Sequence, residues 1–160
     1  MAGEPGHTCR LGPRCAADYQ SRISGPLLDR MDIQLELAAV RAVDLSLPPP
    51  KESSVDVAKR VASARQIQAL RFRELGLEQL RTNAQADGEV LEAVAPLDNA
   101  GMALLRDAAE AMNLSARGYH RVLRVARSIA DLAGSQNVLR LHLAEALSYR
   151  QRPASMRIAA

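Results

Sequence analysis

Three consecutive prolines, at positions 48–50, divide this sequence into two parts with different apolar periodicity. Proline lacks a backbone N–H and fixes φ, so such a run neither continues a helix nor lies in a central strand. Before it, residues 31–37 (MDIQLEL) alternate apolar and polar side chains, which predicts a strand. A lone strand cannot form a sheet, so we expect its partners to lie outside this segment.

After the prolines, apolar residues recur every three or four positions, which predicts a bundle of four or five helices. Ser53 or Ser54 is expected to cap a helix that runs to about Phe72, and a shorter helix is expected over 85–94. Asp98 is expected to cap the next helix. The apolar faces expected to be buried are Val57, Val61 and Ala64 in the first helix, and Met102, Leu105, Ala109 and Met112 in the third.

A further helix is predicted over about 116–133, capped by Ser115 and closed by Gly134. Val122, Val125, Ala126, Ile129 and Ala133 gather on one side of it, whereas Arg117, His120, Arg121, Arg124 and Arg127 gather on the other. We interpret Arg121, Arg124 and Arg127 as a solvated face, and the alternative is that they contact DNA or a neighbouring subunit. A last helix over about 140–150 is expected to bury Leu143 and Leu147.

The composition agrees with packed helices. Hydrophobic residues make up 48% of the chain and aromatic residues only 2%, so the core must consist of aliphatic side chains. The net charge of +3 permits phosphate-bearing partners without requiring them. No apolar stretch approaches the roughly 18 residues that a membrane span needs. With two cysteines and no signal-peptide pattern, the expected compartment is the cytoplasm.

Three long blocks of the sequence carry a resemblance to a known family: 19–32 (YQSRISGPLLDRMD), 114–132 (LSARGYHRVLRVARSIADL) and 142–150 (HLAEALSYR). Together they closely resemble the ComM/YifB family of magnesium-chelatase-like AAA+ ATPases, over a stretch from about Gly6 to Arg152. The resemblance implies a mainly α fold, in which a helical-bundle AAA+ lid subdomain follows a remnant of the α/β ATPase core.

On this resemblance the chain divides into four parts. Residues 1–45 are the core remnant, with a cysteine-containing loop, an arginine-finger helix and the last strand, and we expect them to be poorly ordered without their sheet. Residues 46–53 are a proline-rich linker, and residues 54–152 are the helical lid. Residues 153–160 are a frayed tail.

The resemblance also implies two catalytic residues. Arg30 matches the arginine finger that acts in trans on the nucleotide of a neighbouring subunit, and the alternative is an ion pair with Asp29 or Asp32. Arg117 matches the sensor-2 arginine that binds the γ-phosphate of ATP. The alternative, an ordinary exposed arginine in the first helical turn, is unfavourable beside the helix dipole. Arg22 is a weaker candidate and is expected to form a structural ion pair.

A zinc site is a third possibility. His7, Cys9 and Cys15 supply three ligands, one short of a closed structural site, and the resemblance implies further cysteines upstream. For this chain we expect free thiols instead. His120 and His142 show no partner pattern and are expected at the surface.

The family carries a P-loop and an acidic metal-holding motif, and neither occurs in these 160 residues. ATP and Mg²⁺ are therefore expected to bind the full-length parent, and this chain alone is not expected to hydrolyse ATP. The implied parent is a hexameric DNA helicase that drives branch migration in natural transformation and recombination. Its expected partners are the N-terminal ATPase core, neighbouring subunits and DNA, with no membrane. The alternatives are a magnesium-chelatase motor subunit, which inserts Mg²⁺ into protoporphyrin, and a stand-alone helical interaction module.

Overall fold

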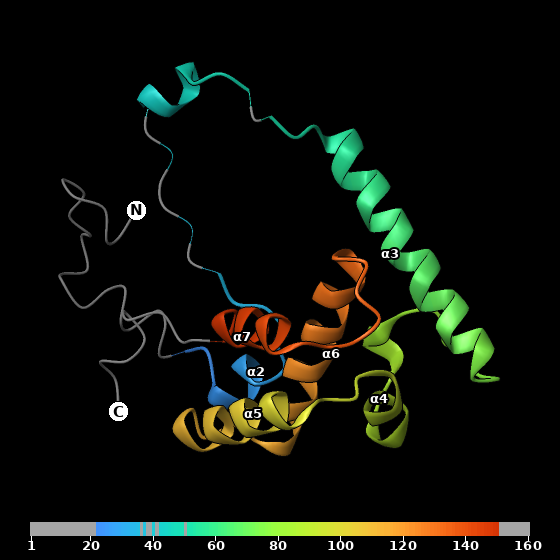
Figure 1. Cartoon of the computed structure of the whole chain (residues 1–160). Coiled ribbons are helices and arrows are strands. Elements are labelled where there is room, and N and C mark those ends of the chain that lie inside the picture. The colour runs from blue at the N-terminus through green and yellow to red at the C-terminus, as the bar shows by residue number, and fades with distance from the viewer. Residues whose placement is uncertain (1–21, 36, 38–39, 41, 50, 151–160) are drawn as a thin grey trace.

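The computed structural model describes residues 22–35, 37, 40, 42–49 and 51–150 (Figure 1). Within these residues the chain is helical and forms no strand, which confirms the predicted mainly α fold. In chain order the elements are α2 (Gly25–Leu28), η1 (Ala42–Ser46), α3 (Ser54–Glu74), η2 (Asn83–Gln85), α4 (Gly88–Val94), α5 (Asn99–Ala111), α6 (Ala116–Leu132) and α7 (Arg140–Ser148), where η denotes a 3-10 helix.

Four of the described helices, α3, α4, α5 and α6, begin at a residue whose side chain caps the helix. Ser53 and Asp56 form a reciprocal capping box at the start of α3, in which the Asp56 N–H donates to Ser53 Oγ at 3.2 Å. Asp98 accepts from the Gly101 N–H at 2.7 Å to begin α5. Ser115 accepts from the Gly118 N–H at 3.0 Å to begin α6. These predicted caps are confirmed, and Gly134 ends α6 with a φ of +67°.

Helix α6 lies at the centre of the bundle (Figure 1). It contacts α3, α4, η2 and α7, and α5 packs on α7. Val122 and Ala126 are fully buried on α6, as predicted, and so are Leu143 and Ala146 on α7. The largest fully buried apolar side chains are Phe72, Leu91, Leu105, Val122, Val138 and Leu143.

The buried face of α5 is rotated from the predicted stripe. Met102 is 52% exposed, so its predicted burial is wrong. The face that packs on the core carries the predicted Leu105 and Met112, together with Leu104 and Ala108, which were not predicted. Gly101 lies on this face, and a Cβ built there would come within 3.3 Å of Leu143 Cδ1. Because a glycine allows α5 to approach α7 along this line, the packed face is centred on Gly101.

Helix α3 packs on the bundle with only its C-terminal half. Ala64, Gln68 and Phe72 are buried, whereas the predicted core positions Val57 and Val61 are exposed. These two side chains are exposed because the N-terminal half of α3 extends beyond the bundle, and no described helix lies beside it (Figure 1).

The strand predicted over 31–37 is not formed in the described part of that segment. Its apolar side chains are exposed, and Leu35 is 65% exposed. A strand needs a hydrogen-bonded neighbour, and the described residues offer none here. A backbone bond from the Gln34 N–H to the Tyr149 carbonyl, at 2.8 Å, joins the segment to the end of α7. Beside it, Ile33 and Leu35 line a groove of about 410 Å³ with residues of α6 and α7.

Candidate functional site

Arg117 lies in the first turn of α6, two residues after the cap Ser115. Its side chain is exposed, and no hydrogen bond or ion pair joins it to another described residue. The N-terminal end of a helix carries a partial positive charge, so an arginine gains nothing from the helix dipole at this position. The guanidinium is therefore available to an anion from outside the bundle.

Arg30 follows the short helix α2 and is also exposed. Neither Asp29 nor Asp32 forms an ion pair with it among the described residues. Asp29 instead contacts Ser115 and Arg150, and Asp32 contacts Arg121. The alternative that Arg30 pairs with a neighbouring aspartate is therefore wrong. Arg22, the weaker candidate, is exposed as well.

The structure brings the two segments that carry the candidate arginines into contact, although they are far apart in sequence. Ser115 Oγ donates to Asp29 Oδ2 at 2.8 Å across 86 positions of the chain. Arg30 directly follows Asp29, and Arg117 lies two residues after Ser115. Both arginines thus emerge beside one contact between the segment after α2 and the start of α6.

The three remaining arginines of α6 are not a solvated face. Arg121 donates to Asp32 at 2.6 Å, and Arg124 lies 3.0 Å from Asp87. Both side chains are less than one-fifth exposed, at 17% and 18%. Arg127 is fully buried, so the predictions that it faces solvent, DNA or another subunit are wrong for this residue. The reason is that α3 and η2 cover this side of α6.

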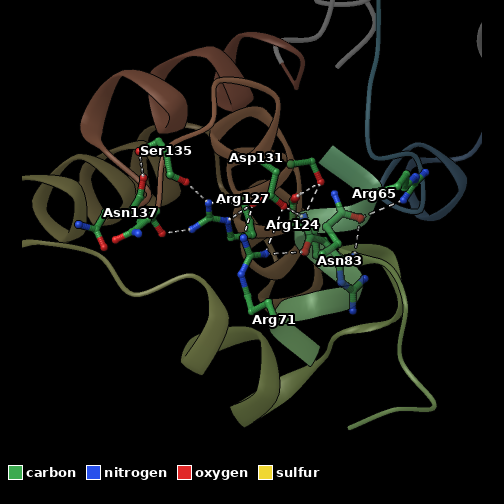
Figure 2. Close-up of polar contacts among 11 residues, drawn as sticks. Arg65, Arg71, Asn83, Arg124, Arg127, Asp131, Ser135 and Asn137 are labelled. Atoms are coloured by element: carbon green, nitrogen blue, oxygen red, sulfur yellow. Dashed lines mark hydrogen bonds and ion pairs between the residues drawn. The ribbon is translucent and has the colours of Figure 1, made fainter. Parts of the chain in front are cut away.

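A buried polar network surrounds Arg127, as Figure 2 shows. Arg127 donates from Nε to Asp131 Oδ1 at 3.1 Å and from its two terminal nitrogens to the carbonyls of Gln136 and Ser135, at 2.7 and 2.6 Å. Arg71 on α3 pairs with the same carboxylate, and Asn83 Nδ2 donates to Asp131 Oδ2 at 2.8 Å. Burial lowers the pKa of Arg127 from its usual value, and the charge of Asp131 opposes this shift.

A second cluster of charged side chains surrounds Asp87, which caps the start of α4. Its carboxylate accepts from the Gly88 N–H at 3.0 Å and lies 3.0 Å from Arg124 and 3.3 Å from His120 Nδ1. The Gly88 hydrogen bond and then the Arg124 charge lower the pKa of Asp87. Arg124 also donates from Nε to the Ala86 carbonyl at 2.7 Å. These contacts give Arg124 and His120 structural partners at the helix start.

His142 was expected at the surface and is instead buried, at 2% exposure. The Leu139 N–H donates to its Nδ1 at 3.1 Å, so the imidazole satisfies a backbone group at the start of α7. The predicted zinc candidates His7, Cys9 and Cys15 lie outside the described residues. Among the residues that are described, no group of three potential ligands is close enough to hold a metal ion. Likewise, no described helix is long and apolar enough to cross a membrane.

Two family models match most of the chain. The model described as "Magnesium chelatase, subunit ChlI C-terminal" matches residues 51–150, and the model described as "Magnesium chelatase, subunit ChlI" matches residues 1–45. These matches place the chain in the magnesium-chelatase family.

Individual proteins that are similar in sequence show to which members of this family the chain is related. The competence protein ComM of Haemophilus influenzae is 35% identical over 88% of this chain and 26% of its own length. The uncharacterized protein YifB of Salmonella typhimurium is 35% identical over 91% of this chain and 28% of its own length. The uncharacterized protein Rv2897c of Mycobacterium tuberculosis is 42% identical over 83% of this chain and 26% of its own length. The chain therefore belongs to the magnesium-chelatase family as a ComM/YifB-like member, and it spans about a quarter of these relatives.

Proposed function

We propose that this chain is the lid and arginine-finger region of an AAA+ ATPase that works as a hexameric motor on branched DNA in the cytoplasm. The observation that carries the proposal is the pair Arg30 and Arg117, both exposed and both without a partner among the described residues. Each lies in a block that resembles a functional motif of the family. One relative is named a competence protein, which favours DNA as the substrate.

The proposed chemistry is charge stabilisation. In phosphoryl transfer, negative charge spreads over the oxygens of the transferred group, and catalysis consists mostly of positioning and neutralising that charge. A guanidinium suits this role because it is planar, permanently charged and able to donate two parallel hydrogen bonds to a phosphate. Arg30 would act as the finger on a neighbouring subunit, and Arg117 would bind the γ-phosphate as sensor 2.

The nucleotide pocket must come from another region. The chain contains no G-x-x-x-x-G-K-[ST] segment, and its described residues offer no cluster for a metal ion. We infer that ATP and Mg²⁺ bind an N-terminal ATPase core of the same protein, which this chain joins through residues 1–45. By itself the chain should not hydrolyse ATP.

The test is an ATPase assay on the full-length protein, with and without branched DNA. Arg30→Ala should lower kcat about a thousandfold or more, as the loss of an arginine finger does in other NTPases. Mixing it with a subunit that lacks the P-loop lysine should restore activity, because that subunit supplies an intact finger to a working pocket. Arg117→Ala should also lower turnover. Unchanged turnover in both variants would contradict the site assignment.

A second candidate function is suggested by the descriptions of both matching family models, which name magnesium chelatase. In that case the parent would be the motor subunit that drives Mg²⁺ insertion into a porphyrin. Stimulation of the ATPase by branched DNA supports the helicase. Stimulation only by a porphyrin with partner subunits, and none by DNA, would replace it with the chelatase.

A further inference from the structure

Asp29 connects the segment after α2 to two helices of the bundle at once. Its Oδ2 accepts from Ser115 Oγ at 2.8 Å, and its Oδ1 accepts from Arg150 Nη2 at 3.1 Å. The same Ser115 hydroxyl caps α6 by accepting from the Gly118 N–H. The carboxylate is therefore joined both to the cap of α6 and to Arg150, two residues after the end of α7.

Arg150 binds the residues on either side of Arg30 in the sequence, Asp29 and Met31. While Nη2 binds the side chain of Asp29, Nη1 donates to the backbone carbonyl of Met31 at 2.9 Å. The Arg150 side chain is only 6% exposed, so its guanidinium has little freedom to move. One buried group thus fixes the residues immediately before and after Arg30, while the side chain of Arg30 itself remains exposed.

Two further contacts extend this attachment. Arg121 Nη1 donates to Asp32 Oδ1 at 2.6 Å, and the Gln34 N–H donates to the Tyr149 carbonyl. Gly118 leaves room for the contact, since a Cβ at this position would lie 3.3 Å from Asp29 Oδ1 and 3.4 Å from Arg150 Nη2. The segment 29–34 is therefore held along its length by α6 and by the end of α7, over a glycine that lets it approach closely.

We propose that Asp29 and Arg150 are positioning residues, which fix Arg30 beside the start of α6 so that its guanidinium meets the nucleotide of the neighbouring subunit in a set geometry. This inference rests on the proposed function of the two arginines. A catalytic group held in place in advance loses little freedom in the transition state, and a displacement of about 1 Å can cost about a hundredfold in rate. Asp29 and Arg150 themselves do not contact the nucleotide.

The first measurement needs only the 160-residue chain and no ATPase activity. The Gln34 amide bonds to Tyr149, so its hydrogen exchange reports whether the segment is attached. Asp29→Asn removes the charge that binds Arg150, and Arg150→Lys removes the forked pair of donors. Each should speed exchange at Gln34 about tenfold or more, because charge-assisted hydrogen bonds are the stronger ones. The amides of Val122 to Ala126 in α6 should be unaffected.

The matched control is Asp107→Asn. Asp107 also pairs with an arginine, but the pair lies at the surface of α5, with both side chains about 70% exposed, at 71% and 69%. It should leave exchange at Gln34 unchanged. Exchange at Gln34 that is equally fast in Asp29→Asn, in the control and in the parent chain would overturn the attachment. Faster exchange throughout α6 would show that Asp29 supports the whole bundle, which also overturns the proposal.

The second measurement uses the full-length ATPase. Asp29→Asn and Arg150→Lys should lower kcat about 10- to 100-fold with little change in KM for ATP, since the pocket is intact. Mixing either variant with subunits that lack the P-loop lysine should restore kcat, whereas a misfolded subunit would not recover. Asp29→Glu, which keeps the charge, should lose less than Asp29→Asn.

Arg30→Ala serves as the reference in the same assay. If it lowers kcat while Asp29→Asn and Arg150→Lys do not, the positioning role is wrong and the proposed function stands. If Arg30→Ala itself has no effect, the proposed function fails. The exchange measurement would then show only that the segment is attached, and the positioning role would fall with the function.

Discussion

At the scale of single residues, Asp131 is the group on which most buried polar contacts converge. It is buried in α6 and accepts hydrogen bonds from Arg71, Arg127 and Asn83, which come from α3, α6 and η2. Two guanidinium groups therefore share one carboxylate inside the bundle. A buried charge without a partner costs far more than the same charge in water, so this carboxylate is needed for folding.

We expect Asp131→Asn to lower the free energy of unfolding by about 3–5 kcal/mol, because it leaves buried arginine charge uncompensated. Urea denaturation followed by circular dichroism measures this loss. The exposed pair of Arg106 and Asp107 provides the control, since Asp107→Asn should cost less than about 1 kcal/mol. Equal losses in the two variants would contradict the importance of the buried network.

His142 makes the free energy of unfolding depend on pH. Burial and then the Arg127 charge lower its pKa from 6.5, and Glu145 opposes this shift weakly. The unfolded chain therefore binds a proton more readily than the folded chain just below that pH. The stability from neutral His142 is present above about pH 6.5 and is lost as the pH falls towards the lower folded pKa.

We therefore expect the free energy of unfolding to decrease between about pH 7 and pH 5.5. His142→Gln does not titrate in this range and should show a clearly smaller decrease. Denaturation of both proteins at several pH values tests this. The same slope in the variant would mean that other groups cause the dependence.

At the scale of secondary-structure elements, α3 is attached at one end only. Phe72 is fully buried, whereas Val57 is exposed on the half that extends beyond the bundle. Phe72→Ala should lower the free energy of unfolding by about 3–5 kcal/mol, because it leaves a cavity in the core. Val57→Ala should cost less than about 1 kcal/mol, since an exposed position loses little apolar contact.

Hydrogen exchange along α3 provides an independent measurement of the same attachment. Amides of residues 64–74 should exchange slowly, and those of 54–63 should exchange faster, because only the first group lies on the packed half. Uniform protection along the helix would show that its N-terminal half is covered in solution and would contradict this description.

At the scale of the whole molecule, the sequence predicted what depends on nearby residues and missed what depends on distant ones. The caps Ser115 and Asp98 were predictable because a cap acts on the next three residues. The strand was not formed, because its partner strands are absent from the described residues. The burial of Arg127 was missed because helical periodicity separates apolar from polar faces and does not show that α3 covers the polar one.

The same limit applies to the candidate site. Arg30 and Arg117 were identified through their motifs, and the structure places both at the surface. The attachment of the Arg30 segment through Asp29 and Arg150 had no signal in the sequence, since aspartate and arginine are ordinary surface residues. The LLDRMD block contains two aspartates, and only the folded chain shows that each binds a different arginine of the bundle.

The contact between Asp29 and Arg150 joins residues 121 positions apart in the sequence, and this separation affects the order in which the chain folds. Closing so long a loop costs more chain entropy than joining neighbouring helices, so the contact should form after the bundle has collapsed. A ribosome must also release the C-terminal helix before Arg150 can reach its partner. Weakening the contact should therefore accelerate unfolding and leave the folding rate nearly unchanged. The segment around Arg30 should therefore be fixed later than the helices of the bundle and released before them.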